Sequence, residues 1–236
     1  GLACRGSGAE AMAQGDALGF VSSPAAVEWP ARVGASAALA RLCCDQGRSC
    51  TGPLAEIALT DRLLRSWVRC RRRAWLDRHG PAEQRQWNAH RALALQEQVQ
   101  SFQALSHSRP HHGLAACAAG ADAVVGLRLK GEGPAGLRLE AHPPLLQRTK
   151  GQSAWGPWTY RPVLARQGYR TTREHRLQLA LWGRLLAPMQ QAEVGDGLVV
   201  AGGPRLQQER VSLGGGLQRQ LDESLQRLAS DLASLQ

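Results

Sequence analysis

The stretch WTYRPVLARQGYRTTREHRLQLALWGRLLAPM, Trp158–Met189, decides the fold because it predicts a strand, a turn and a helix in succession. Thr159–Arg166 is rich in Tyr, Val and Leu, which favours a strand, and the glycine that follows permits a turn. Thr171 or Thr172 is suited to cap the helix, and Pro188 predicts its end. Apolar residues recur at helical spacing on one face of this helix: Leu177, Ala180, Leu181 and Leu185.

Upstream of this stretch, Ala123–Lys130 and Leu137–His142 predict two strands joined as a hairpin by the turn GEGPAG. Residues 151–158 (GQSAWGPW) predict a turn before the next strand. Downstream, Gly197–Ala201 and Glu209–Leu213 predict two short strands. A leucine repeat from residue 217 to 235 then predicts a terminal amphipathic helix.

Two helices are predicted before the hairpin. The first begins near Asp61 with Thr60 as a possible cap and runs to Gly80-Pro81, where a glycine cap is followed by a helix breaker. The second spans Trp87–Leu105, with Leu93, Leu95, Val99, Phe102 and Leu105 expected to face inward, and residues 106–113 are expected to form a loop. Together, these elements predict an α/β sandwich with a central mixed sheet.

Length, charge and cysteine content limit the functional classes. The chain has 236 residues and a formal net charge of +10. Residues 1–56 carry four Arg and five acidic residues, whereas residues 57–236 carry 25 basic and 14 acidic residues. The first segment therefore predicts a poorly ordered, low-complexity extension, and the second a basic domain suited to a polyanion such as DNA. No apolar run approaches ~18 residues, and no secretory signal is visible. We therefore expect a cytoplasmic protein with no membrane partner, whose six Cys are reduced.

The decisive stretch resembles the RecB-like nucleases, a branch of the PD-(D/E)XK superfamily. In that family a strand ends in an acid, one further residue and Lys, and the next helix carries Gln-x-x-x-Tyr. Gln178 and Trp182 match the helix pattern, with Trp in place of Tyr, whereas Leu164 replaces the acid and Arg166 the Lys. The family's other acid follows a proline after the preceding strand, and Pro144 occupies that position here. The resemblance covers roughly residues 57–236, a domain that is either truncated at its C-terminus or lacks the C-terminal cysteine cluster found in many members of the family.

The resemblance also implies cofactors. RecB-like nucleases hydrolyse phosphodiester bonds with Mg²⁺ or Mn²⁺ held by two acids. A His early in the helical region, here His90, can contribute to that metal site. In many members a Cys on the first helix, matched here by Cys70, is one of four ligands of an iron–sulfur cluster. The other three Cys lie near the C-terminus, and no Cys follows Cys117, so the cluster is expected only in a longer form of the chain.

Candidate site residues follow from this resemblance and from the basic helix. The candidate catalytic residues are Glu140, Glu174, Arg166 and Gln178. The candidate nucleic-acid-binding residues are Arg69, Arg71, Arg72, Arg73, Gln178 and Trp182. Since Gln178 and Trp182 are four positions apart, they share a helix face, which we expect to border a cleft with Trp182 beside Arg166.

Three hypotheses of function are compatible with these patterns. The chain is a RecB-like DNA-binding protein of DNA processing or repair whose hydrolysis is weakened or lost. Alternatively, it is an active exonuclease whose metal ligands have migrated to Glu140 and Glu174. From a different class, it is a non-enzymatic assembly module that binds RNA or protein. Metal-dependent cleavage distinguishes the second from the first, and salt-sensitive DNA binding distinguishes the first from the third.

Overall fold

The computed structural model describes residues 58–81, 89–106, 109–202 and 205–234, so the extension expected over residues 1–56 lies outside the described residues. A six-stranded sheet in the order β2-β3-β6-β7-β8-β9 forms the centre. Its strands are β2 (His111–His112), β3 (Ala123–Val125), β6 (Leu145–Ser153), β7 (Gly156–Ala165), β8 (Asp196–Ala201) and β9 (Gln207–Ser212). The pairs β2–β3 and β7–β8 are parallel and the others antiparallel, which confirms an α/β fold with a mixed sheet.

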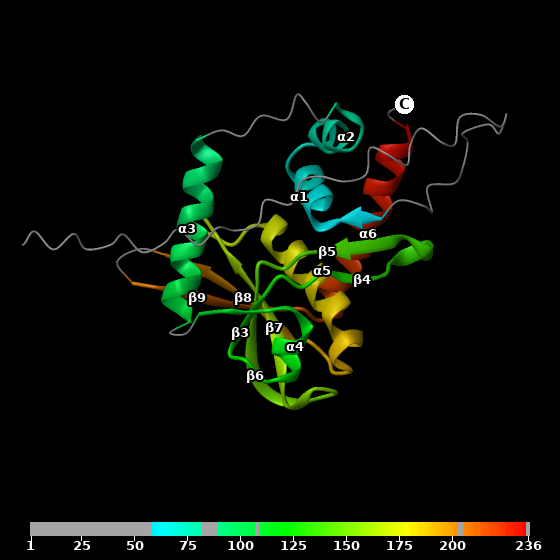
Figure 1. Cartoon of the computed structure of the whole chain (residues 1–236). Coiled ribbons are helices and arrows are strands. Elements are labelled where there is room, and N and C mark those ends of the chain that lie inside the picture. Colours follow the sequence, from blue (N-terminus) through cyan, green and yellow to red (C-terminus); the bar gives the residue numbers. More distant parts are fainter. Residues whose placement is uncertain (1–57, 82–88, 107–108, 203–204, 235–236) are drawn as a thin grey trace, which may run out of the picture. The chain divides into compact units, whose positions relative to one another are not determined.

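Helices cover both faces of this sheet (Figure 1). On one side lie α5 (Arg173–Gln190), α1 (Asp61–Arg69) and α6 (Gly215–Ser234), and on the other α3 (Ala89–Leu105). Successive side chains of β7 point to opposite faces of the sheet. Leu164 belongs to the core beneath α5, while the adjacent Val163 packs in the cluster that includes Phe102 of α3. Among the described residues, no helix is long and apolar enough to span a membrane.

A smaller sheet lies beside α5 and combines β1 (Leu59–Thr60), β5 (Arg138–Ala141) and β4 (Leu129–Glu132) in the order β1-β5-β4. A short 3₁₀ turn, η3 (Pro134–Gly136), joins β4 to β5, which confirms the predicted hairpin. The predicted strand Ala123–Lys130 is wrong in one respect, because the chain turns at Gly126, where φ is +74°. Its two halves, β3 and β4, therefore belong to different sheets.

The decisive stretch folds largely as predicted. Thr172 caps α5, since its hydroxyl accepts a hydrogen bond from the His175 backbone N–H at 3.4 Å. Contrary to the prediction, Pro188 does not end the helix. It lies in the last turn, and α5 continues to Gln190. The chain then leaves the helix through Gln191 in the left-handed conformation, with φ of 50°.

Several other boundaries differ from the prediction. The predicted first helix is broken at Cys70, whose backbone is extended, so α1 is followed by a separate α2 (Arg71–His79). Gly80 has φ of −70° and is therefore not a left-handed cap. The predicted turn over residues 151–158 is mostly strand, because β6 and β7 form a long hairpin joined by two residues.

Two predictions about α3 and its loop are also wrong. Leu93 is 58% exposed and Leu95 37% exposed, so these two leucines do not face inward. The predicted loop after the helix contains the short strand β2 and leads into α4 (Gly113–Ala118). The predicted terminal helix is confirmed as α6, where Leu221, Leu225, Leu228 and Leu232 are buried.

Candidate functional site

The candidate site is a cleft of about 300 Å³ between α1 and α5. Its wall includes residues from both helices, from the segment after β5 and from the end of β7. The described residues that line it are Asp61, Arg62, Arg65, Arg69, Gln98, His142, Pro144, Leu164, Ala165, Gln167, Glu174, His175, Gln178 and Trp182. The fold therefore brings Pro144 and Leu164 to the same cleft as Gln178 and Trp182.

Helix α5 supplies one wall of the cleft. Gln178 is 7% exposed and Trp182 3% exposed, and both line the cleft, which confirms the prediction that their helix face borders one. The Gln178 amide has no hydrogen-bond partner among the described residues. The amide atoms of Gln178 are not among the fully buried polar atoms that lack a hydrogen bond, so the amide is open to the cleft. Gln178 is therefore placed where a ligand in the cleft can form hydrogen bonds with it.

Asp61 fixes the floor of the cleft and was predicted only as part of a helix start. Its Oδ2 accepts a hydrogen bond from Trp182 Nε1 at 2.9 Å and one from the His142 backbone N–H at 3.2 Å. Its Oδ1 accepts from the Arg62 backbone N–H at 2.9 Å. Asp61 is only 8% exposed, so this buried carboxylate joins α1, α5 and the segment after β5.

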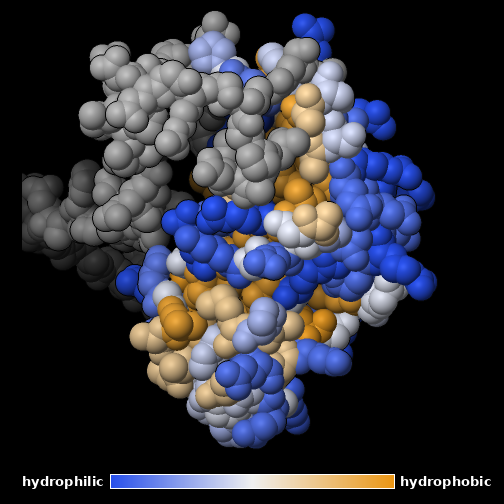
Figure 2. All heavy atoms as spheres, turned by 90° about the vertical axis from the view of Figure 1, so that its right-hand side faces the viewer, coloured by the Kyte–Doolittle hydropathy of each residue, from blue (hydrophilic) through white to orange (hydrophobic). Residues whose placement is uncertain are grey.

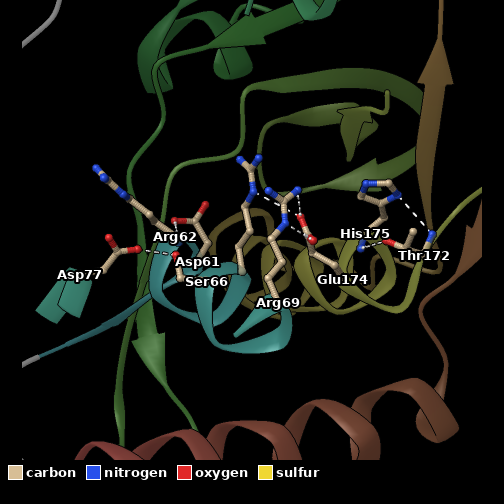
Figure 3. A network of polar contacts seen from close by, with 9 residues as sticks. Asp61, Arg62, Ser66, Arg69, Asp77, Thr172, Glu174 and His175 are labelled. Atoms are coloured by element: carbon tan, nitrogen blue, oxygen red, sulfur yellow. Dashed lines mark hydrogen bonds and ion pairs between the residues drawn. The ribbon is translucent and has the colours of Figure 1, made fainter. Parts of the chain in front are cut away.

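Glu174 projects from the first turn of α5 toward Arg69 of α1 (Figure 3). Its Oε2 accepts from Arg69 Nε at 2.6 Å and its Oε1 from Arg69 Nη2 at 2.9 Å, a two-point contact. Arg65 Nε lies 3.2 Å from Oε1. The Glu174 side chain is 10% exposed, whereas each arginine side chain is 45% exposed. The carboxylate is thus enclosed, and the guanidinium groups remain open to the solvent side.

His175 completes the polar edge of the cleft. Its Nδ1 accepts from the Thr172 backbone N–H at 3.2 Å, so helix capping uses the imidazole as an acceptor. Burial lowers the pKa of His175 below its ordinary value; the nearby Arg69, Arg65 and Arg166 act in the same direction, and Glu174 opposes them. The ring is therefore held neutral at pH 7.

The remaining candidate acid, Glu140, lies on β5 and not among the described residues that line the cleft. Arg128 donates to both of its carboxylate oxygens, from Nε at 2.6 Å and from Nη2 at 2.7 Å. Hydrogen bonding to Arg128 holds the pKa of Glu140 below its ordinary range, and burial opposes this effect. Glu140 and Glu174 are thus held by different arginines at different places in the fold.

The contacts of Arg166 also differ from the expectation. Its guanidinium donates to the backbone carbonyl of Gly168, and its Nη2 donates to Gln207 Oε1 at 2.9 Å. Trp182 directs its indole N–H to Asp61, and within the described part of the chain no cation–π contact joins Arg166 to Trp182. Arg166 is 8% exposed and ties the end of β7 to the start of β9.

The other predicted residues lie outside the cleft. Arg71, Arg72 and Arg73 occupy the exposed first turn of α2, and Arg71 Nε lies 3.3 Å from Asp231 of α6. Cys70 is exposed between α1 and α2, whereas Cys117 is buried in α4. His90 falls in the first turn of α3, but its side chain is outside the described ones.

The donor set of the cleft does not fit the divalent metal that the resemblance implies. Pro144 and Leu164 offer no side-chain oxygen, and the two carboxylates present, Asp61 and Glu174, are engaged by protein donors. Within the described part of the chain, no three His, Cys, Asp or Glu side chains gather to form a metal site. Nor does Cys70 have a second cysteine beside it there to share an iron–sulfur cluster.

A larger groove of about 950 Å³ lies along the far part of β6 and β7. Its arginines are matched by acids: Arg148 Nη2 lies 2.5 Å from Asp122 Oδ1, and Arg161 Nη1 lies 2.9 Å from Asp196 Oδ2. The groove therefore combines charges of both signs. Figure 2 shows another face of the molecule, where hydrophilic residues surround smaller hydrophobic areas. The α1–α5 cleft remains the better candidate because Gln178 and Trp182 line it together with Pro144 and Leu164.

Comparison with known proteins adds no identification: no protein-family model matches the chain, and neither does any curated protein.

Proposed function

We propose that this protein is a RecB-like, nuclease-related protein of DNA processing or repair. In this proposal the cleft between α1 and α5 binds the phosphate backbone of DNA, and phosphodiester hydrolysis is weakened or lost. The observation that carries the proposal is the content of the cleft. Three arginines and an unpartnered glutamine line it, while both of its carboxylates are occupied by protein donors.

The chain topology supports the assignment to this class of nuclease. The strand β7 leads into α5, as the resemblance implies, and the chain then returns to β8, which pairs parallel to β7. The positions matched to the two acids of the family, Pro144 and Leu164, line the cleft together with Gln178 and Trp182. In this proposal the cleft takes the position of the family's active site, while its chemistry differs.

The electrostatics of the cleft support binding of a polyanion without hydrolysis. Arg62, Arg65 and Arg69 all come from one helix and line one side of the cleft. Arginine suits phosphate because its planar guanidinium can donate two parallel hydrogen bonds. In a metal-dependent nuclease, carboxylates hold the cation that activates water and stabilises the developing charge. Without free carboxylates the same location retains phosphate binding and lacks that step.

Fluorescence anisotropy with a labelled 20-nucleotide single strand and the full chain tests this proposal. We expect binding in EDTA that weakens steeply as salt rises, and no cleavage of the strand in Mg²⁺ or Mn²⁺. Gln178→Ala should weaken binding about fivefold, the equivalent of one net hydrogen bond of ~1 kcal/mol. The matched control is Gln103→Ala, an exposed glutamine on α3, which should change nothing.

Two results would contradict the proposal. Metal-dependent cleavage that is lost on replacing Glu140 or Glu174 would instead indicate an active exonuclease with migrated ligands. Salt-insensitive or undetectable DNA binding, with binding of RNA or of a protein, would favour an assembly module.

A further inference from the structure

Glu174 occupies the place where an external anion would meet the arginines of the cleft. The carboxylate makes a two-point contact with the Nε and Nη2 edge of Arg69 and also neutralises Arg65. Carboxylate and phosphate share this geometry, since each presents two oxygens to the planar guanidinium. Figure 3 shows Glu174 of α5 and Arg69 of α1 directed toward one another.

Two further features of the same place favour an anion. Glu174 lies in the first turn of α5, an 18-residue helix whose N-terminus faces the cleft through Glu174 and His175. The N-terminal end of a helix attracts negative charge because its first N–H groups lack carbonyl partners within the helix. One turn further along α5, Gln178 lines the cleft, and its amide is open to it for hydrogen bonding.

We propose that a phosphate group of the ligand takes the place of Glu174 on Arg65 and Arg69. Glu174 then acts as an internal competitor that lowers phosphate affinity and keeps the arginines ordered when no ligand is present. This inference rests on the proposed function, because it concerns the same cleft and names the group that the cleft recognises.

The exposures indicate how the exchange occurs. Each arginine side chain is 45% exposed, so an incoming phosphate can reach the guanidinium groups from the solvent side. Glu174 lies deeper, with a 10% exposed side chain, and its negative charge opposes that of the approaching phosphate. The cleft therefore holds its own counter-ion, and a ligand must compete with that counter-ion for the arginines.

The chain provides a matched control for this idea. Asp222 of α6 also accepts a hydrogen bond from an arginine, since Arg184 Nη1 donates to its Oδ1, and its side chain is 40% exposed. Asp222 is not among the residues that line the cleft. Asp222→Asn and Glu174→Gln therefore raise the net charge equally and differ in location.

The test measures the affinity of the full chain and both variants for a single-stranded oligothymidylate, with and without a 5′-phosphate. We expect Glu174→Gln to tighten binding about tenfold, since it removes a like charge beside the phosphate while retaining one acceptor for Arg69. Asp222→Asn should stay within about twofold of the natural protein. A gain seen only with the 5′-phosphate indicates a terminal phosphate, and an equal gain with both strands indicates an internal phosphodiester. Unchanged or weaker binding by Glu174→Gln would overturn the inference, because Glu174 would then be a positioning residue or a metal ligand.

A second measurement uses the natural protein and so does not depend on the folding of a variant. Inorganic phosphate titrated into ¹⁵N-labelled protein should shift the Nε–H resonances of Arg65 and Arg69 and leave that of Arg128 in place. Phosphate that shifts neither resonance would refute the exchange. If the natural protein and both variants all fail to bind the strand, the proposed function fails. If the natural protein binds and Glu174→Gln is no tighter, the inference alone fails.

Discussion

The arginines of α1 and those of α2 are close in sequence but lie in different surroundings. Arg65 and Arg69 of α1 face a cleft that also contains the N-terminus of α5 and the amide of Gln178. Arg72 and Arg73 of α2 lie on an exposed surface, beyond the break in the helix at Cys70. The difference shows that charge density along a sequence indicates a polyanion, whereas the neighbours of each charge indicate where a particular phosphate binds.

The largest expected effect is on the free energy of unfolding, and it compares a buried residue of the cleft with an exposed residue of α2. Trp182→Ala removes a 3% exposed indole from the cleft floor and leaves Asp61 Oδ2 without that donor. We expect a loss of roughly 3–5 kcal/mol in the free energy of unfolding, measured by urea denaturation. The α2 control, Leu76→Ala, replaces a 48% exposed side chain and should stay within about 0.5 kcal/mol. Equal losses in the two variants would mean that the cleft is no more a part of the core than α2.

The difference between local and distant neighbours also explains how much of this fold can be predicted from the sequence. The start of α5 and its buried face were predicted correctly because they depend on neighbouring residues, such as Thr172 with His175. Strand pairing is less local: β6 continues through Lys150-Gly151-Gln152 because β7 lies beside it, although those residues favour a turn. No local pattern indicates the break at Cys70, which separates two helical segments of similar composition.

The candidate site was predicted only in part for the same reason. Gln178 and Trp182 were found because they share one helix face and match a known motif. Asp61 was missed as a cleft residue because its donor, Trp182, is 121 positions away. The sequence also leaves undetermined which arginine each acid contacts. Glu140 and Glu174 look equivalent in the sequence, and only the fold assigns one to Arg128 and the other to Arg69.

An intermediate effect is expected when the α2 surface is neutralised. Replacing Arg71, Arg72 and Arg73 with Gln should flatten the dependence of log K on log salt, by about 0.7 for each phosphate contact that is lost on single-stranded DNA. Affinity near 0.1 M salt should fall by roughly 1–2 kcal/mol, measured by anisotropy over a salt series. The gain expected for Glu174→Gln should persist in this background, because that gain arises in the cleft. An unchanged slope would show that α2 does not contact the strand.

The smallest effect concerns pH and compares two histidines, His175 in the cleft and His79 on α2. His175 is held neutral in the folded protein because burial lowers its pKa from the ordinary value of 6.5, and its Nδ1 must stay unprotonated to accept from Thr172. The unfolded chain therefore binds a proton before the folded chain does as pH falls. The contribution of neutral His175 to stability is present above pH 6.5 and is lost as pH falls through the lowered folded-state pKa. We expect the free energy of unfolding to fall by less than about 1 kcal/mol, the size of one helix cap, between unfolding curves measured at pH 7.5 and pH 5.

His175→Gln retains a side-chain acceptor and should flatten this part of the pH dependence. His79→Gln replaces an exposed histidine of α2 and should leave the pH dependence of stability as in the natural protein. If His79→Gln flattens the pH dependence and His175→Gln does not, the titrating group belongs to α2, and the capping contact of His175 contributes nothing measurable to stability.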